Sequence, residues 1–302
     1  MTPDFQIISD GSCDLPVSLV EQNHLQVVPF YVSFDSTSYK KEGVDISVRE
    51  FYDQMVEHPK TFPKSSMPSA EDYRQVFEPL VQKNIPIICI CITTKFSGSM
   101  QSAVTARDLI LEDYPDARIC VIDATVNTVL QGLLVLEAAK MQQAGWSYEE
   151  TIARINEIKS TGRIFFTIGN IDYLKHGGRI GKLSALAGSV LGIRPLITLK
   201  EGEIFPSGIA RSRNRSLDKV MHLLLGYLKE CKADIKDYSL ALGYGYDLEE
   251  GKVFRKQLIE KLGSEYPVTE EELPLYQIGA GISVHTGPYA LGIGIIRRFD
   301  AK

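Results

Sequence analysis

The sequence predicts an α/β protein with two parts: an amino-terminal domain built on a parallel sheet and a carboxyl-terminal α+β domain with a mixed sheet. The first indication is the run at 85–93, where apolar residues do not alternate with polar ones. A strand of this kind is covered on both faces, as in a parallel sheet between helices. The second indication is the regular alternation of strand and helix patterns before residue 160, which gives way to a hairpin pattern after it.

The amino-terminal domain is expected to contain four strands, at 6–9, 27–34, 85–93 and 118–123. The helices between them are expected to begin near residues that cap or open a helix: Pro16, Ser47, Ser69, Gly98 and Thr125. Ser69 is followed three residues later by Asp72, which is the spacing of a capping box. The same spacing at Ser147 and Glu150 predicts one more helix, ending near residue 161.

The carboxyl-terminal domain is expected to begin near residue 160, so that the two domains span 1–160 and 161–302. A hairpin is predicted at 194–210, with Glu201 and Gly202 in its turn. The other expected elements are a strand at 164–168, a short helix at 171–175, helices at 183–191, 212–231 and 248–262, and strands at 238–244, near 276 and at 291–297.

Composition and charge exclude several classes of protein. The 302 residues are 44% hydrophobic and 24% charged with a net charge of -5, which is typical of a soluble globular protein and argues against nucleic-acid binding. Arg211, Arg213, Arg215 and Lys219 could form a local basic patch, with a solvated helix face as the alternative. No apolar stretch reaches transmembrane length and residues 1–5 lack signal-peptide features, so a cytoplasmic location without an integral membrane segment is expected.

Cysteines and histidines give no sign of a cofactor site. The chain has five cysteines, and an odd number fits reduced thiols. Cys89 and Cys91 would place their side chains on the same face of a buried strand, which core packing explains better than a metal. Because the histidines lack metal-ligand spacing, neither a metal nor another cofactor is expected.

Polar residues follow the buried strand at 85–93, where Ser97 and Gly98 open the next helix. The free amides of a helix start stabilise anions. Because the segment lacks both the P-loop motif and the dinucleotide fingerprint, a small anion or a carboxylate head group is the expected ligand. Similar polar turns occur at 9–14, 65–69 and 285–288, although each of them alone is more often only a turn or a cap.

His285 stands beside Thr286, Gly287 and Pro288, a sequence that predicts a tight turn, and it is expected either to contact a ligand or to be a structural histidine. Ser97 and His285 could meet across a cleft between the domains, but the G-x-S-x-G elbow of serine hydrolases is absent. The helix expected at 183–191 carries small residues, so it would either pack closely on a sheet or line an apolar tunnel.

Seven segments, distributed in this order over nearly the whole chain, together resemble the DegV family of bacterial fatty-acid-binding proteins. They are Ser9-Asp-Gly-Ser-Cys-Asp-Leu-Pro16, Ser65-Ser-Met-Pro-Ser69, Thr93-Thr-Lys-Phe-Ser-Gly-Ser99, Val121-Ile-Asp123, Leu174-Lys-His-Gly-Gly-Arg-Ile180, Ile193-Arg-Pro195 and His285-Thr-Gly-Pro288. Each segment alone is a turn, whereas their common order is a specific signal.

The resemblance implies a long-chain fatty acid held between the two domains and presented to a fatty acid kinase, which forms an acyl phosphate for phospholipid synthesis. It implies no further cofactor and no catalytic residue of the protein's own. The carboxylate would be bound by Ser97, Ser65 and His285, with Ser66 and Gly98 beside them. The arginines that would contact the partner or the phosphate are Arg179, Arg211 and Arg213.

The chain departs from the family pattern at several of these positions. The family commonly has Thr at Ser65 and Ser99, Gln at Met67, and Ser at Gly11 and Ala124. Ser65 keeps the hydroxyl group that carboxylate binding requires, whereas Met67 removes a polar group and would alter the head-group network.

A second interpretation belongs to another class of protein. The resemblance also suggests that the amino-terminal fold is shared with dihydroxyacetone kinases and sugar phosphotransferase components. In an enzyme of that kind, His285 would form a covalent adduct or accept a phosphoryl group.

Overall fold

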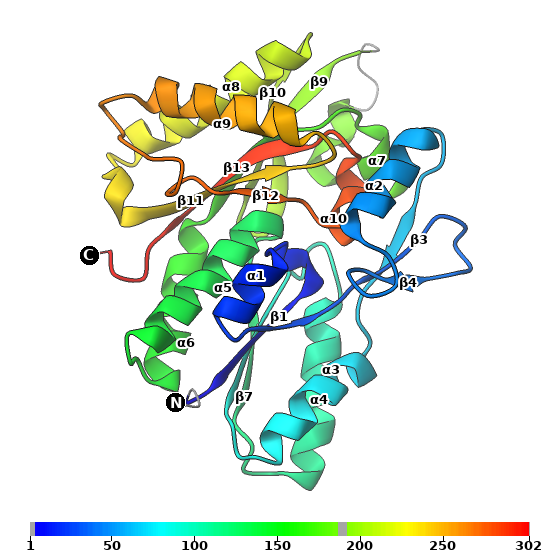
Figure 1. Cartoon of the computed structure of the whole chain (residues 1–302), viewed down its shortest axis with the longest axis vertical. Helices are drawn as coiled ribbons and strands as arrows, with labels where there is room; N and C mark the ends of the chain where they lie inside the picture. The colour runs from blue at the N-terminus through cyan, green and yellow to red at the C-terminus, as the bar shows by residue number, and fades with distance from the viewer. Residues whose placement is uncertain (1–3, 187–191, 302) are drawn as a thin grey trace.

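The computed structural model describes residues 4–186 and 192–301. Its strands form a four-stranded parallel sheet, a six-stranded mixed sheet and a small three-stranded antiparallel sheet. The two larger sheets occupy opposite ends of the molecule, with the four-stranded sheet below the six-stranded one in Figure 1. The predicted fold class, a parallel-sheet α/β part followed by a mixed-sheet α+β part, is confirmed.

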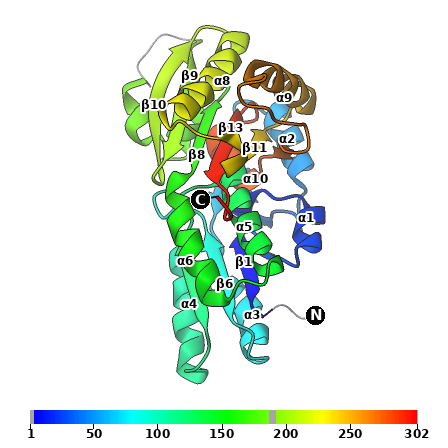
Figure 2. The same ribbon diagram turned by 90° about the vertical axis from the view of Figure 1, so that its left-hand side faces the viewer.

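The four-stranded sheet has the order β2-β1-β6-β7 and consists of β1 (Gln6–Asp10), β2 (Gln26–Val28), β6 (Ile87–Cys91) and β7 (Ile119–Asp123). All five residues of β6 are buried, as its apolar sequence predicts. Its two faces are covered by α3 (Ala70–Val81) and α4 (Ser99–Asp113) on one side, and by α5 (Thr128–Gln143) and α6 (Tyr148–Ile158) on the other (Figures 1 and 2). The carboxyl ends of the strands point toward the six-stranded sheet (Figure 1).

The six-stranded sheet has the order β10-β9-β8-β13-β11-β12. Its strands are β8 (Arg163–Thr167), β9 (Arg194–Lys200), β10 (Glu203–Ala210), β11 (Tyr238–Tyr244), β12 (Leu275–Gln277) and β13 (Leu291–Arg297). Helices α8 (Arg213–Glu230) and α9 (Leu248–Leu262) pack on one face. The β9–β10 hairpin is confirmed, and its turn residues Glu201 and Gly202 have the positive φ angles, 53° and 80°, that a tight hairpin requires.

The three-stranded sheet lies at the side of the molecule, between the levels of the two larger sheets (Figure 1). It consists of β3 (Tyr31–Ser33), β4 (Lys40–Lys41) and β5 (Lys64–Ser66). Both β3 and β5 contact α10 (Ala280–Thr286), and α2 (Val48–Glu57) packs on the same helix. The remaining elements are α1 (Val17–Gln22), α7 (Asp172–His176) and the 3-10 helices at Gly11–Cys13, Lys159–Thr161, Gly181–Leu186 and Ile235–Asp237.

Three expected elements differ from the structure. The single strand expected at 27–34 is wrong: the chain leaves the parallel sheet before Pro29, which has no backbone N–H for a ladder, and β3 joins the three-stranded sheet. The segment around His285 is the helix α10 and not only a turn. The helix expected at 183–191 is a 3-10 helix, Gly181–Leu186, in its described part, while 187–191 lie outside the described residues.

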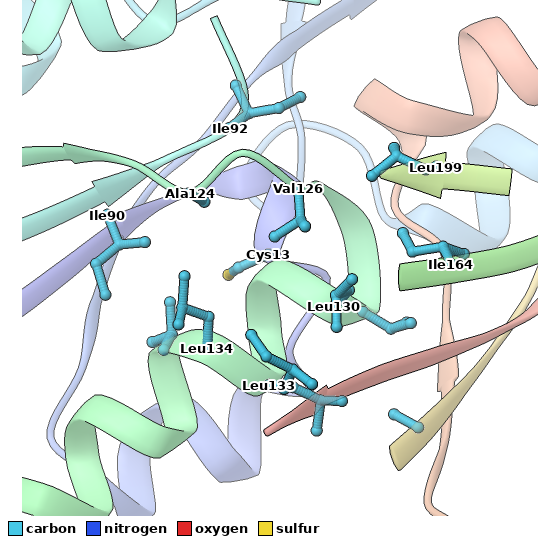
Figure 3. Close-up of a cluster of buried hydrophobic side chains, with 14 of the residues drawn as sticks. Cys13, Ile90, Ile92, Ala124, Val126, Leu130, Leu133, Leu134, Ile164 and Leu199 are labelled. Atoms are coloured by element: carbon cyan, nitrogen blue, oxygen red, sulfur yellow. The ribbon is translucent and has the colours of Figure 1, made fainter. Parts of the chain in front are cut away.

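One hydrophobic core extends from the parallel sheet to the six-stranded sheet. The helix α5 is buried on nearly all sides because it packs on β1 and β6 and also on β11 and β13. Figure 3 shows its side chains Leu130, Leu133 and Leu134 between Ile90 of β6 and Ile164 of β8. The domain boundary near residue 160 stays a prediction. No helix in the described ranges is long and apolar enough to cross a membrane.

Candidate functional site

A cavity of about 300 Å³ lies where the carboxyl ends of the parallel strands meet the six-stranded sheet. The end of a parallel sheet, at a junction with a second layer, is a common place for a ligand. Most of the wall is apolar and comes from both sheets and from the helices between them, with Phe30, Ile92, Val129, Phe166, Leu199 and Ile282 among its residues. Such a wall suits an aliphatic ligand.

One end of this cavity is polar. Three segments that are distant in sequence meet there: β5, the loop before α4, and the last turn of α10. The residues that they contribute are Ser65 and Ser66, Ser97 and Gly98, and His285. The structure therefore brings together all five residues that the sequence analysis names for a carboxylate, and that role stays a prediction.

Ser65 and His285 contact each other directly, because β5 is held against α10. The pairing of β5 with β3 places Ser65 opposite Val32, and the Ser65 hydroxyl lies 3.3 Å from Nε2 of His285. The other ring nitrogen of His285, Nδ1, is buried and has no hydrogen-bond partner among the described residues. Because Nδ1 packs against Gly177, Nε2 beside Ser65 is the ring nitrogen through which the imidazole can contact a ligand.

The electrostatic environment keeps His285 neutral at physiological pH. Burial and the nearby positive charge of Arg179 lower the pKa of His285 to about 4. A neutral imidazole keeps one N–H donor and one acceptor nitrogen. It can donate a hydrogen bond to an anion without the cost of burying a permanent positive charge.

Ser97 is positioned by a hydrogen-bonded chain that begins at a buried acid. Asp10 accepts hydrogen bonds from the amide of Ile92 at 2.9 Å and from the hydroxyl of Ser99 at 2.8 Å. The amide of Ser99 in turn donates to the hydroxyl oxygen of Ser97 at 3.2 Å. Both ends of the loop between β6 and α4 are therefore fixed, and Gly98, rather than Ser97, is the N-cap of α4.

Met67 covers the backbone of Gly98 at the mouth of the cavity. A β-carbon on Gly98 would lie only 2.7 Å from the Met67 sulfur, so the absence of a side chain lets Met67 approach this closely. Met67 is 44% exposed. Where the family commonly has Gln, this chain therefore has an apolar side chain that packs against the start of α4.

Arg179 is the one predicted arginine that lines the cavity. Its Nε and Nη2 atoms donate to the carbonyl of Phe96 at 3.1 and 3.0 Å, and Nη1 donates to the carbonyl of Gly177 at 2.6 Å. The guanidinium thus joins the end of α7 to the loop before α4. It also separates the cavity from an adjoining hollow of about 450 Å³ that is lined by Lys95, Lys182 and Glu203.

The other two predicted arginines lie outside the cavity wall. Arg213, in the first turn of α8, forms a bidentate ion pair with Glu250 of α9, with N–O distances of 2.7 and 2.5 Å. Arg211 is exposed at the end of the β9–β10 hairpin. The structure does not bring either of them to the polar end.

A second group of polar residues in the wall consists of Ser12, Asn127 and Thr128. Ser12 lies in the polar turn at 9–14 that the sequence analysis names, whereas Asn127 and Thr128 were missed. Asn127 follows the predicted strand at 118–123 just as Ser97 follows the strand at 85–93. Side chains after neighbouring parallel strands meet at one edge of the sheet, and this signal could have identified Asn127.

Two catalytic arrangements, a serine nucleophile with a histidine base and a metal centre, are not formed by the described residues. Within residues 4–186 and 192–301, no hydrogen bond joins Ser97 to His285, as a serine nucleophile and its base would require. No group of three metal-binding side chains is placed to hold an ion in the same ranges.

Comparisons with known proteins agree with this fold. A family model described as "Uncharacterised protein, DegV family" matches residues 4–298. A DegV domain-containing protein of Clostridium perfringens is 32% identical over 294 residues, which cover 97% of this chain and 98% of the relative.

Two solved structures are similar over nearly their whole length. A stearic-acid-binding protein from Eubacterium ventriosum is 43% identical, with a TM-score of 0.93 over 98% of this chain and 99% of the other. A fatty-acid-binding DegV family protein from Thermus thermophilus is 27% identical, with a TM-score of 0.85 over 97% and 99% of the two chains. This chain belongs to the DegV family.

Proposed function

We propose that this protein binds a long-chain fatty acid, with the acyl chain in the apolar cavity and the carboxylate at Ser65, Ser97 and His285. The observation that carries this proposal is the asymmetry of the cavity, which is apolar along most of its wall and has two hydroxyls and a neutral imidazole at one end. Structures of two related proteins are described as fatty-acid-binding, one of them with stearic acid, which supports the same ligand class.

The energetics allow tight binding. Burial of roughly fifteen methylenes at about 0.8 kcal/mol each contributes about 12 kcal/mol, from which the cost of association and ordering must be subtracted. The carboxylate loses hydration when it enters, and each charge-assisted hydrogen bond returns about 1.5–3 kcal/mol. Ser66 and the backbone at Gly98 lie beside these donors and would complete the head-group site.

We further propose that the bound carboxylate is presented to a fatty acid kinase, and that this protein acts in the bacterial cytoplasm as the kinase's lipid-binding partner rather than as an enzyme. The polar end adjoins the hollow that contains Lys95, Arg179 and Lys182. Because Lys182 pairs with Glu203 at 2.5 Å, Lys95 and Arg179 supply the excess positive charge. An acyl phosphate would add negative charge at this place.

The first experiment is mass spectrometry of the purified protein, native and then after denaturation and organic extraction. A stoichiometric fatty acid, absent from the protein of a Ser65→Ala/Ser97→Ala double variant, is the expected result. A protein that stays free of lipid after incubation with mixed fatty acids would refute the proposal. The same spectra test the phosphotransferase alternative, which requires a covalent or phosphoryl adduct on His285.

The kinase step has a separate test, in which the fatty-acid-loaded protein is incubated with a bacterial fatty acid kinase and ATP. Arg179→Ala and Arg211→Ala are expected to slow acyl-phosphate formation with little change in fatty-acid affinity. Arg213→Ala would act through loss of its ion pair with Glu250 at the start of α8, so its thermal unfolding must be measured beside its kinetics. Unchanged kinetics in all three variants would remove these arginines from the partner contact.

A further inference from the structure

We propose that the acyl cavity contains a second polar subsite, at Asn127, which selects fatty acids that carry a hydroxyl group on the chain. This inference rests on the proposed function, because it concerns the chain of the same ligand. It would give the cavity a specificity for oxygenated chains in addition to its carboxylate site.

Asn127 is half-buried and lines the cavity, and its side-chain amide has no hydrogen-bond partner in the described part of the chain, whereas its backbone carbonyl accepts from the amide of Gln131 at 3.2 Å. It is the N-cap residue of α5, a position where the side chain of Asn ordinarily accepts a hydrogen bond from the first turn. In this helix no such cap bond forms. The amide group, with two hydrogens to donate and one oxygen to accept, is therefore available to a ligand.

An unusual backbone conformation accompanies the unused amide. Thr128, the next residue, has a φ of 48°, in the left-handed region that a β-branched residue rarely adopts. Its hydroxyl donates to a carboxyl oxygen of Asp14 at 2.5 Å, which helps to hold this conformation. Strained residues that the surrounding structure holds in place are frequent at ligand sites, and Thr128 itself lines the cavity.

The surrounding groups favour a neutral hydroxyl over other polar groups. The Ser12 hydroxyl lies 2.6 Å from an acceptor oxygen of Asp10 and 2.6 Å from one of Gln131, and the Thr128 hydroxyl donates to Asp14, so only their oxygen lone pairs remain for a ligand. The acidic side chains behind them disfavour a second carboxylate or a phosphate. A hydroxyl group, which both donates and accepts, matches the amide of Asn127 together with these oxygens.

An unsubstituted chain is the poorer ligand at this place. A methylene group against Asn127 would remove water from the amide without replacing its hydrogen bonds, and an unpaired buried polar group is unfavourable. Recovery of one such bond corresponds to roughly a tenfold gain in affinity. The expected preference for the correctly hydroxylated acid is therefore about tenfold.

The test is a set of dissociation constants for delipidated protein with octadecanoic acid and its 3-, 10- and 12-hydroxy derivatives. The wild-type protein is expected to bind at least one hydroxy acid about tenfold more tightly than octadecanoic acid. Asn127→Leu, which keeps the size but removes the amide, is expected to lose this preference and to bind octadecanoic acid at least as well. Asn127→Ala serves as a second variant, and thermal unfolding shows that each variant is folded.

Two outcomes would overturn the inference. One is a wild-type protein that binds octadecanoic acid as tightly as every hydroxy acid, as expected if an ordered water occupies the amide. The other is a hydroxyl preference that survives in both Asn127 variants. Failure of the wild-type protein to bind any of the four acids would instead refute the proposed function, so the two failures are distinguishable.

Discussion

The buried Nδ1 atom of His285 lies directly against Gly177, so a β-carbon at Gly177 would overlap the imidazole ring. Gly177 itself has an ordinary helical φ of -75°. Its neighbour Gly178 has a φ of 67° and open space where a β-carbon would stand. The two adjacent glycines thus have different physical requirements, since the first makes room for the ring and the second allows the backbone to turn.

This difference gives a matched pair of variants. Gly177→Ala is expected to displace the His285 ring and weaken fatty-acid binding about tenfold, because one hydrogen bond to the carboxylate is lost. Gly178→Ala is expected to lower the free energy of unfolding by about 1 kcal/mol through backbone strain, with little effect on binding. Calorimetric titration and thermal unfolding of both variants check the prediction. Equal affinities in the two variants would contradict a role for His285 in binding.

The hydroxyls of Ser65 and Ser97 give a second prediction. Ser65→Ala and Ser97→Ala are each expected to weaken fatty-acid binding by roughly tenfold or more, because each removes a hydrogen bond to a charged group. Ser147→Ala is the control, because Ser147 caps α6 with a complete capping box and does not line the cavity. It is expected to reduce stability by about 1 kcal/mol and to leave the dissociation constant unchanged. Loss of binding in the control would point to a general effect of unfolding.

Local sequence signals predicted the parts of the fold that depend on neighbouring residues. Ser47, Ser69 and Ser147 each begin a helix as expected, and all three form capping boxes with the acidic residue three positions later. The hairpin turn at Glu201 and Gly202 is of the same kind, because its conformation is set by two residues. These interactions form within one turn of chain, so a pattern of adjacent residues contains the information.

Features that depend on distant residues were not predicted. The break between β2 and β3 separates strands that join different sheets, and nothing near Pro29 specifies which sheet each one joins. Glu42 accepts hydrogen bonds from the amide of Ala280, 238 residues away, and the helix α10 that this contact supports was expected only as a turn. Ser97 and His285 could be paired in advance only as one possibility across a cleft, and Ser65 joined them only through the family resemblance.

A third prediction concerns the pH dependence of the protein without ligand. The pKa of His285 is lowered from 6.5 to about 4 by burial and by Arg179, so the unfolded chain takes up a proton at a higher pH than the folded one. The stability that His285 contributes is therefore complete above pH 6.5 and is lost as the pH falls toward 4, by at most about 1.4 kcal/mol for each pH unit.

Substitution of His285 and ligand binding separate its pH-dependent contribution to stability from the contributions of other titrating groups. His285→Phe is expected to remove it, so that denaturation curves between pH 4 and 6.5 become flatter than those of the wild-type protein. A bound carboxylate favours the protonated imidazole and should also reduce the slope. Wild-type and variant curves with the same slope would show that His285 does not titrate in this range.

The last prediction concerns two buried acids behind the cavity wall, Asp14 and Glu42. Glu42 accepts hydrogen bonds from the amides of Ala280 and Gly281, at 2.6 and 2.9 Å, and thereby holds the first turn of α10. One carboxyl oxygen of Asp14 is buried against Gly279 without a hydrogen-bond partner among the described residues. Desolvation raises the pKa of Glu42 to about 7, and desolvation together with the charge of Glu42 raises the pKa of Asp14.

A raised carboxyl pKa has the opposite effect on stability to the lowered pKa of His285. The folded protein holds the proton of Glu42 more tightly than the unfolded chain, so this contribution is complete below pH 4.5 and is lost as the pH rises toward 7, by at most about 1.4 kcal/mol for each pH unit. Glu42→Gln has no charge to bury, but its single oxygen can accept from only one of the two α10 amides. Its stability relative to the wild-type protein is therefore expected to rise from pH 4 to pH 8, and Asp14→Asn is expected to behave in the same direction. Equilibrium denaturation at both pH values tests this prediction. An equal effect of Glu42→Gln on the free energy of unfolding at pH 4 and pH 8 would mean that the carboxyl group does not titrate between them.

Since α10 also carries His285, fatty-acid affinity measured on the same variants would show whether Asp14 and Glu42 influence the head-group site.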